Sequence, residues 1–341
     1  MINFKQTLKQ EQLIKIKVIK EEQYGPITED AEKLSKGLSK LHQEKKGFYC
    51  EKIDNKVLKS LFFMSNRMKI LLGKFSDVVF IDATHKSNRF NLPLLDGAII
   101  NNLGQTCSCF WSFISDHTYN SYFWAIYQLK RIGNILPKLF VIDEEEALYQ
   151  GFFFIYNLLT PIAIKKVFPK SKIFFCSWHT SNNLKKHFMY LNKKKTDEAK
   201  TVYRKIINLP YCDYVDDYHA IYEETIKNKL LSEDSISYLQ KRNKYCDQWV
   251  KAFMKGHFTG GTCTTSRIEA KHRILKKFLN SELQKVFEVF AELESIEIKN
   301  YIVEFASFTK VEEEVFMKAY MLNHFSKIFC PYAMNKVKLN F

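Results

Sequence analysis

Three apolar runs follow one another in quick succession, and this spacing constrains the fold more than any other feature. They are "DVVFIDATH" from residue 77, "LPLLDGAII" from residue 92 and "TCSCFWSFIS" from residue 106. Turn-forming residues separate them, including Asn88 and Asn91 in the first gap and Asn101 in the second. The gaps are too short for a parallel return, which needs a crossover of about a dozen residues. We therefore predict three consecutive antiparallel strands.

Two more strands are expected downstream, each reached through a helix. The helical stretch "NSYFWAIYQLKRI" leads to the strand of "LPKLFVIDEEEAL", which runs into an acidic helix start, and "KSKIFFCSWHTSNNLKKHF" combines a fifth strand with a helix. A connection through a helix permits parallel pairing. Three antiparallel strands followed by helix-linked parallel strands is the order of a ribonuclease-H-like α/β core, which is the fold class we predict.

The rest of the chain divides around this core. Upstream, "GFYCEKIDNKVLKSLFFM" has the alternating pattern of a hairpin. Between residues 191 and 262 the apolar residues recur every three to four positions, which indicates an all-helical insertion. The expected organisation is a helical or partly disordered lead-in (1–46), a hairpin and helix (47–75), the first part of the core (76–190), the helical insertion (191–262), and core completion with C-terminal helices (263–341).

Charge and cysteine usage limit the partners and the compartment. The 52 Lys and Arg residues against 37 Asp and Glu residues give a formal charge of +15, which favours a polyanion such as nucleic acid over a membrane surface. The N-terminus has no apolar signal region, and "GFFFIYNLLTPIAI" is shorter than the roughly 20 residues of a membrane helix. The eight cysteines are scattered without a disulfide framework. An intracellular, reducing compartment is expected.

Asp82 and Asp143 each end an apolar strand, where α/β folds commonly place ligand-binding groups. Taken singly, Asp82 could be a turn residue and Asp143 a helix N-cap. If their strands are neighbours, however, both carboxylates emerge at one sheet edge. Two like charges so close raise each other's pKa unless a cation neutralises them. The pair therefore predicts a site for divalent cations, Mg²⁺ or Mn²⁺, of the kind used in phosphoryl displacement.

Glu269 is the candidate for a third carboxylate ligand. It lies in the basic stretch "GTCTTSRIEAKHRILKK" from residue 261, on a predicted helix with an apolar stripe. One alternative is a capping box, in which Glu269 folds back onto the backbone N–H of Ser266. The other is a glutamate beside a basic flank that follows a phosphate backbone. The predicted phosphate contacts are Lys185, Lys186, Lys271, His272, Arg273, Lys276 and Lys277.

Two further features have competing explanations. Cys176 and His179 form a C-x-x-H pair, which is half of a structural Zn²⁺ site, and the remote Cys212, Cys246, Cys263 and His257 offer no obvious completion. The alternative is a buried thiol beside a hydrogen-bonded histidine. Trp249 could stack on a DNA base, but a large aromatic residue in an amphipathic helix is more often part of the core.

These motifs, in this order, resemble those of the Mutator-like element (MULE) transposases and their far-red-impaired-response relatives. The resemblance runs from about Gly47 to Lys277 and rests on "FIDATHKSN", "LFVIDEEEAL", "KKVFPKSKIFFCSWH" and "TTSRIEAKH". It implies that the family's DDE triad falls on Asp82, Asp143 and Glu269, and its C-x-x-H motif on Cys176 and His179. It also implies a helical insertion before the glutamate.

The resemblance further implies a function. A DDE transposase uses two Mg²⁺ or Mn²⁺ ions to cleave double-stranded DNA and transfer the strand, works as a homo-oligomer on DNA, and acts in the nucleus. The alternatives are a domesticated DNA-binding or transcription-regulating protein without catalysis, and a nuclease acting on RNA hybrids. The stretch at 149–161 is longer than is usual in the family, and we expect a catalytic core without zinc-finger targeting modules.

Overall fold

The computed structural model describes residues 30–54, 57–85, 87–88, 92–143, 159–194, 196–279 and 285–300. The chain divides into two compact units. The first comprises the described residues of 1–75, 83–135 and 270–341, and the second those of 76–82 and 136–269. Expectations for the lead-in before residue 30, the acidic helix start after Asp143, the stretch at 149–158 and the C-terminal helices beyond residue 300 lie outside the described residues.

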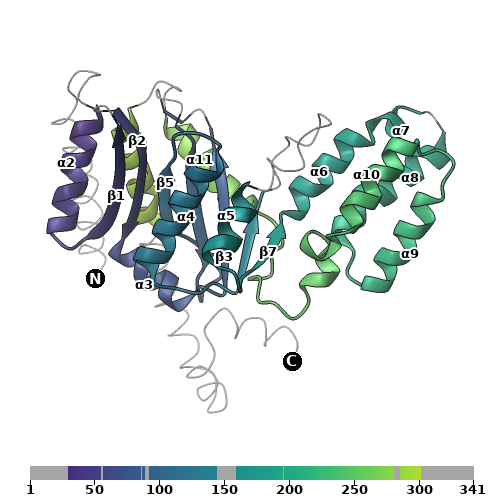
Figure 1. Ribbon diagram of the computed structural model, residues 1–341, viewed down its shortest axis with the longest axis horizontal. Helices are drawn as coiled ribbons and strands as arrows, with labels where there is room; N and C mark the ends of the chain where they lie inside the picture. The colour runs from purple at the N-terminus through teal and green to yellow at the C-terminus, as the bar shows by residue number, and fades with distance from the viewer. Residues whose placement is uncertain are drawn as a thin grey trace, which may run out of the picture. The chain divides into compact units, whose positions relative to one another are not determined.

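The first unit opens with the predicted hairpin. Helix α2 (Asp30–Gln43) precedes strands β1 (Gly47–Asp54) and β2 (Val57–Ser65), which pair antiparallel from Gly47 opposite Ser65 (Figure 1). Helix α3 (Asn66–Lys74) follows at once, because the Ser65 hydroxyl accepts the Met68 N–H at 3.1 Å and caps its first turn. The predicted hairpin and the helix after it are confirmed.

Strands β4 (Leu94–Ile100) and β5 (Thr106–Phe113) pair antiparallel, as the short gap between them predicted. The turn is fixed by Asn101, whose side-chain oxygen accepts the backbone N–H groups of Leu103 and Gln105 at 3.0 and 2.9 Å. Every residue of β4 is buried, including Asp96. Gly97 is required there, since a Cβ would overlap the ring of Phe110 on the neighbouring strand.

Helix α4 (Tyr119–Gly133) has a defined start and end. Its N-cap Thr118 accepts the N–H of Ser121, and it ends at Asn134, which adopts the left-handed conformation with φ of 50°. The core of this unit is aromatic. Phe63 stacks on Trp111 at 5.8 Å between ring centroids, and Phe290, from a helix over 286–300, packs edge-on against Phe63 at 4.8 Å.

Parallel strands organise the second unit. Strand β3 (Val78–Thr84) pairs with β6 (Leu139–Ile142), and β6 pairs with β7 (Lys172–Phe175), both in parallel. Their apolar runs are almost wholly buried, as is typical of strands covered on both faces. Helices α5 (Leu159–Val167) and α6 (Ser177–His187) precede and follow β7. The predicted helix-linked parallel strands are confirmed.

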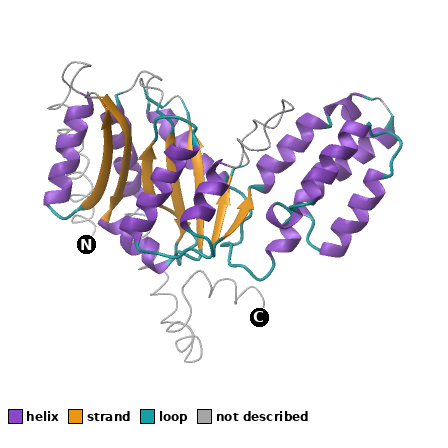
Figure 2. Ribbon diagram, in the orientation of Figure 1, coloured by secondary structure: helices purple, strands orange, loops and turns teal. Residues whose placement is uncertain are grey.

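Together the strands form a mixed seven-stranded sheet with the order β1-β2-β5-β4-β3-β6-β7 (Figure 2). In the second unit, helices follow from residue 189 to 254, and the described residues from 191 to 262 contain no strand, as predicted. No helix in the described ranges is long and apolar enough to cross a membrane. The helices of this stretch are α7 (Met189–Lys193), α8 (Asp197–Asn208), α9 (Val215–Ile226) and α10 (Glu233–Asn243), with 3-10 turns at Leu209–Tyr211, Cys246–Gln248 and Lys251–Met254.

Candidate functional site

Three neighbouring strands of the second unit are in register up to their last paired residues, and a residue with a carboxyl or thiol group follows each of these. Strand β3 itself continues to Thr84, so Asp82 lies within it, beyond the last pair with β6. Ile81 lies opposite Ile142, and Ile142 lies opposite Phe175. The next residues along the three chains are Asp82, Asp143 and Cys176. Adjacent strands lie about 4.8 Å apart, so these residues stand side by side at the carboxyl edge of the parallel strands. The premise that the strands of Asp82 and Asp143 are neighbours is confirmed.

His179 connects this edge to the basic helix α11 (Ser266–Phe278). It lies in the first turn of α6, with its Nδ1 2.8 Å from Asp143 Oδ1 and its Nε2 3.7 Å from Glu269 Oε1. Burial by itself lowers the pKa of His179, but hydrogen bonds to Asp143 and Cys176, and the charges of both groups, raise it to about 10. The imidazole is therefore a cation at neutral pH, in contact with two carboxylates.

Glu269 is oriented by the residue that starts its helix. Because α11 begins at Ser266, the N-cap position is Thr265, whose carbonyl accepts the N–H groups of Ile268 and Glu269 at 2.8 and 3.1 Å. The Thr265 hydroxyl donates to Glu269 Oε1 at 3.2 Å. A capping box joins the N-cap to the third helical residue, which here is Ile268. Ser266 and Glu269 each lie one residue too far along the helix to form a capping box.

Cys176 completes a compact group. Its buried Sγ accepts the backbone N–H of Thr265 at 3.3 Å. Among the residues that the structure describes, one group of three could hold a metal ion, and it consists of Cys176, His179 and Glu269, with ligand atoms within 4.8 Å of one another. We call these three residues together with Asp143 the histidine cluster. Asp82, Asp143 and Glu269 do not form a group of that closeness within the described residues.

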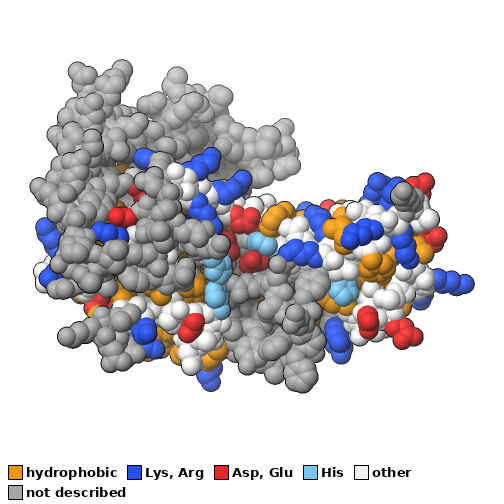
Figure 3. All heavy atoms as spheres, turned by 90° about the horizontal axis from the view of Figure 1, so that it is seen from above, with side chains coloured by type: hydrophobic (Ala, Val, Ile, Leu, Met, Phe, Trp, Pro, Cys, Tyr) orange, Lys and Arg blue, Asp and Glu red, His pale blue; other side chains and the backbone are white. Residues whose placement is uncertain are grey.

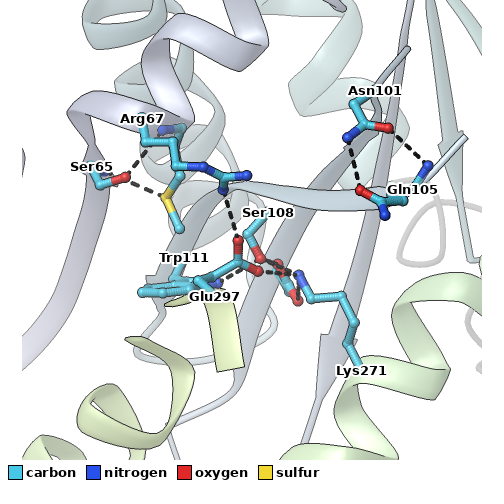
Figure 4. A network of polar contacts seen from close by, with 10 residues as sticks. Ser65, Arg67, Asn101, Gln105, Ser108, Trp111, Lys271 and Glu297 are labelled. Carbon is cyan, nitrogen blue, oxygen red and sulfur yellow. Dashed lines mark hydrogen bonds and ion pairs between the residues drawn. The ribbon is translucent and has the colours of Figure 1, made fainter. Parts of the chain in front are cut away.

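Two predicted phosphate contacts on α11 are wrong, because Lys271 and His272 are buried. The Lys271 ammonium lies 3.3 Å from Asp96 Oδ2 and 3.4 Å from Glu297 Oε1, and it donates to the Ser108 hydroxyl (Figure 4). His272 Nε2 lies 3.7 Å from the same Asp96 oxygen. We call four of these residues the lysine cluster: Asp96, Ser108, Lys271 and Glu297. All four belong to the first unit.

Two further residues contact the lysine cluster. Arg67 reaches Glu297 Oε2 at 3.6 Å, and the Trp111 indole donates to the Ser108 hydroxyl at 3.1 Å (Figure 4). Burial raises the pKa of Asp96, opposed by the positive charge of Lys271. Burial lowers the pKa of Lys271, but Asp96 and Glu297 outweigh it and the net shift is upward. Lys271 is thus a charged structural residue.

Trp249 belongs to the core, as is more common for a large aromatic residue, so the alternative in which it stacks on a DNA base is wrong. It is 1% exposed, its indole N–H donates to the Arg242 carbonyl at 3.1 Å, and Tyr218 packs edge-on against it at 5.8 Å. Of the remaining predicted phosphate contacts, Lys185 is half-buried and four are exposed: Lys186, Arg273, Lys276 and Lys277. On the face of the α6–α10 segment seen in Figure 3, Lys and Arg side chains are interspersed with Asp and Glu.

Comparison with known proteins agrees with the resemblance predicted from the motifs. Residues 78–183 match the MULE transposase domain. The chain is 22% identical to Protein FAR1-RELATED SEQUENCE 5 of Arabidopsis thaliana over 63% of its length, and 20% identical to Protein FAR1-RELATED SEQUENCE 11 over 77%. It covers 26% and 37% of those two proteins. It is also 24% identical to the PKS-NRPS hybrid synthetase cheA of Chaetomium globosum, over 60% of this chain and 5% of that protein.

Proposed function

Because residues 78–183 match a MULE transposase domain, we propose that this chain is the core of a DDE-type DNA transposase. It cleaves double-stranded DNA and joins the freed 3′-hydroxyl to a target strand. The observation that carries the proposal is the register of β3 and β6, which puts Asp82 beside Asp143 at one sheet edge. Glu269 reaches the same imidazole as Asp143. The strand order β5-β4-β3-β6-β7 is compatible with the ribonuclease-H-like core that we propose.

The carboxylates suit a divalent cation. Asp82, Asp143 and Glu269 would hold Mg²⁺ or Mn²⁺, since hard cations prefer carboxylate oxygens. Such ions stabilise the attacking and leaving oxygens of a phosphodiester. In the structure, Asp143 and Glu269 already share one positive charge, that of His179. His179 thereby orients both carboxylates and limits their mutual repulsion in the absence of other cations.

The exposed bases provide the approach for DNA. We propose that Lys185, Lys186, Arg273, Lys276 and Lys277 contact phosphates, that the protein acts as a homo-oligomer on DNA, and that it works in the nucleus. Replacing Arg273, Lys276 and Lys277 by Gln is expected to reduce the slope of log affinity against log salt by about 2.7, at about 0.9 for each lost contact. Fluorescence anisotropy with a duplex measures this slope, and Lys227→Gln, at the exposed residue just after α9, is the control. An unchanged slope in the triple variant would rule out these contacts.

The second candidate is a domesticated DNA-binding protein without catalysis. Two observations favour it: the three carboxylates do not meet in one close group within the described residues, and the curated relatives include FAR1-related proteins. In that case the sheet edge keeps the ancestral residues, while the basic surface of α11 still binds duplex DNA. Binding without metal-dependent cleavage distinguishes this candidate from the transposase.

The deciding experiment is a cleavage and joining assay. The chain is incubated with Mg²⁺ or Mn²⁺ and a labelled duplex taken from the DNA on either side of its gene, together with a plasmid target. We expect metal-dependent nicks and joined products, lost at least 100-fold in Asp143→Asn, since removing a group that stabilises the transition state costs 10²–10³ in rate. Asp213→Asn, an exposed carboxylate paired with Lys251, is the matched control. Cleavage that survives Asp143→Asn contradicts the mechanism.

A further inference from the structure

The histidine cluster has a ligand set that the carboxylate chemistry does not use. Its three potential ligand atoms are a thiol, an imidazole nitrogen and a carboxylate oxygen, supplied by the end of β7, the first turn of α6 and the first turn of α11. All three residues belong to the second unit. Mg²⁺ does not seek thiolate ligands, whereas Zn²⁺ and its neighbours in the transition series bind sulfur and imidazole well.

The backbone holds these ligands in place before any ion arrives. The two helix starts are tied to each other by the Thr265 N–H, which donates to Cys176 Sγ at 3.3 Å, and by the Ser177 N–H, which donates to the Cys263 carbonyl at 3.0 Å. A donor aimed at the sulfur favours the thiolate, which is the ligand form of cysteine. These two bonds therefore hold the helix starts that carry the ligands next to each other.

The distances fit a tetrahedral ion with small adjustments. Metal–ligand bonds of about 2.0 to 2.3 Å place neighbouring ligand atoms roughly 3.3 to 3.7 Å apart. His179 Nε2 and Glu269 Oε1 are 3.7 Å apart, and all three ligand atoms lie within 4.8 Å of one another. Since His179 and Glu269 are partly exposed, their side chains can close the remaining difference by rotation. Three protein ligands leave a fourth position for water.

The outer contacts are those of a metal-binding histidine. In protein sites, the ring nitrogen that does not bind the metal donates to a carboxylate or carbonyl, which fixes the orientation of the ring. Here Asp143 Oδ1 lies 2.8 Å from His179 Nδ1, so the ring presents Nε2 toward Glu269. The Thr265 hydroxyl in turn holds Glu269 through Oε1 at 3.2 Å.

From this geometry we propose that Cys176, His179 and Glu269 bind one Zn²⁺ ion, with Asp143 as the carboxylate behind His179. When Zn²⁺ occupies this site, Glu269 is a ligand and Asp143 holds the ring of the ligand His179. Both carboxylates are then withdrawn from the Mg²⁺ site at the sheet edge, so the two metals exclude one another. The zinc site stands by itself, whereas this antagonism rests on the proposed function.

Co²⁺ in place of Zn²⁺ tests the site without any activity measurement. The full chain, titrated with Co²⁺ under reducing conditions, is expected to bind one equivalent and show a thiolate-to-cobalt charge-transfer band that Zn²⁺ abolishes. The band is expected to vanish in Cys176→Ser and to need at least tenfold more Co²⁺ in His179→Gln and in Glu269→Gln. Asp143→Asn, which removes the outer partner, is expected to weaken binding about 10- to 100-fold.

The controls separate the site from other thiols and from misfolding. Cys212→Ser, a half-buried cysteine of the same unit, is expected to keep the band. Since Cys176 is buried, circular dichroism establishes whether its variant folds, and the partly exposed His179 and Glu269 variants decide the matter if it does not. No band in the wild-type chain, or a band unaffected by these three substitutions, overturns the proposal.

The antagonism has its own readout. In the DNA cleavage assay, Zn²⁺ at one equivalent is expected to suppress Mg²⁺-dependent cleavage by the wild-type chain at least tenfold, and Cys176→Ser is expected to lose most of that suppression. Equal suppression in both proteins overturns the antagonism. If the chain cleaves no DNA at all, the proposed function fails, and the Co²⁺ titration still decides the metal site.

Discussion

The histidine cluster and the lysine cluster are both groups of opposite charges, and the helix α11 contributes to each, yet they differ in what they can do. In the lysine cluster Asp96 is 0% exposed, and Lys271 bridges two carboxylates and a hydroxyl. In the histidine cluster, the side chains of His179 and Glu269 are 20% and 28% exposed. One cluster is sealed and can only hold the helix in place, while the other is open to an incoming ion.

The difference also lies in the type of cation. A lysine beside buried carboxylates stays charged, as the upward pKa shift of Lys271 shows, and it offers no lone pair to a metal. An imidazole can lose its proton and then becomes a metal ligand. Helix α11 thus carries a lysine, Lys271, that stays charged beside Asp96 and Glu297. It also carries an acid, Glu269, whose cationic partner His179 can be replaced by a metal ion. A charged residue on the buried side of α11 therefore stabilises the fold, whereas a charged residue at its partly exposed start is available to bind an ion.

The largest expected effect comes from breaking the lysine cluster. Lys271→Met leaves Asp96 and Glu297 buried without their shared cation and is expected to destabilise the fold by about 3–5 kcal/mol. Urea unfolding measures the loss. Lys276→Met, an exposed site on the same helix, is expected to change stability by less than about 0.5 kcal/mol. The double variant Asp96→Asn with Lys271→Met is expected to recover part of the loss, and no recovery would show that packing, rather than charge, is responsible.

A smaller loss is expected from opening the histidine cluster. His179→Gln removes charged hydrogen bonds and is expected to cost roughly 1.5–3 kcal/mol at pH 7. The pKa of His179 rises from 6.5 to about 10 on folding, so its contribution is complete below about pH 6.5 and is lost as pH rises through about 10. Thermal unfolding of both proteins at pH 6 and pH 10 tests this. A difference in Tm that does not shrink at pH 10 contradicts the assignment.

The smallest effect separates the two explanations of the helix start. Thr265→Ala removes the buried hydroxyl that holds Glu269, and is expected to cost about 1 kcal/mol. Ser266→Ala is expected to stay within about 0.5 kcal/mol, because Ser266 lies inside the helix. Thermal unfolding of the two variants gives the comparison. The reverse order of effects would restore the capping box between Ser266 and Glu269.

The sequence predicts the local elements well because they depend on short-range patterns. The runs ending in Asp82 and Asp143 are apolar and bounded by turns, and a helix between strands permits the parallel pairing that the structure has. The C-x-x-H pair is also visible in the sequence. That Glu269 lies beside this pair is not visible, because the contact joins positions far apart in the chain, and a C-x-x-H pair points to further cysteines or histidines rather than to a glutamate.

The error on α11 has a specific physical origin. Ile268, Lys271, His272 and Leu275 have the i, i+3, i+4, i+7 spacing of a core-facing stripe, and all four are buried. The charges of Lys271 and His272 concealed this spacing, since charged residues are almost never fully buried unless they are paired. The signal for the pairing is Asp96, a single acid inside the otherwise apolar run "LPLLDGAII", and Glu297 could not be matched to it from the sequence alone.

The most direct test of the account is Mn²⁺ binding to the sheet edge, measured by electron paramagnetic resonance with the DNA-free chain. If Asp82, Asp143 and Glu269 form a divalent-metal centre, the wild-type chain binds Mn²⁺. Asp82→Asn, Asp143→Asn and Glu269→Gln each weaken that binding at least tenfold, while Asp213→Asn leaves it unchanged. Binding that is absent from the wild-type chain, or equal in all four variants, would contradict the central claim.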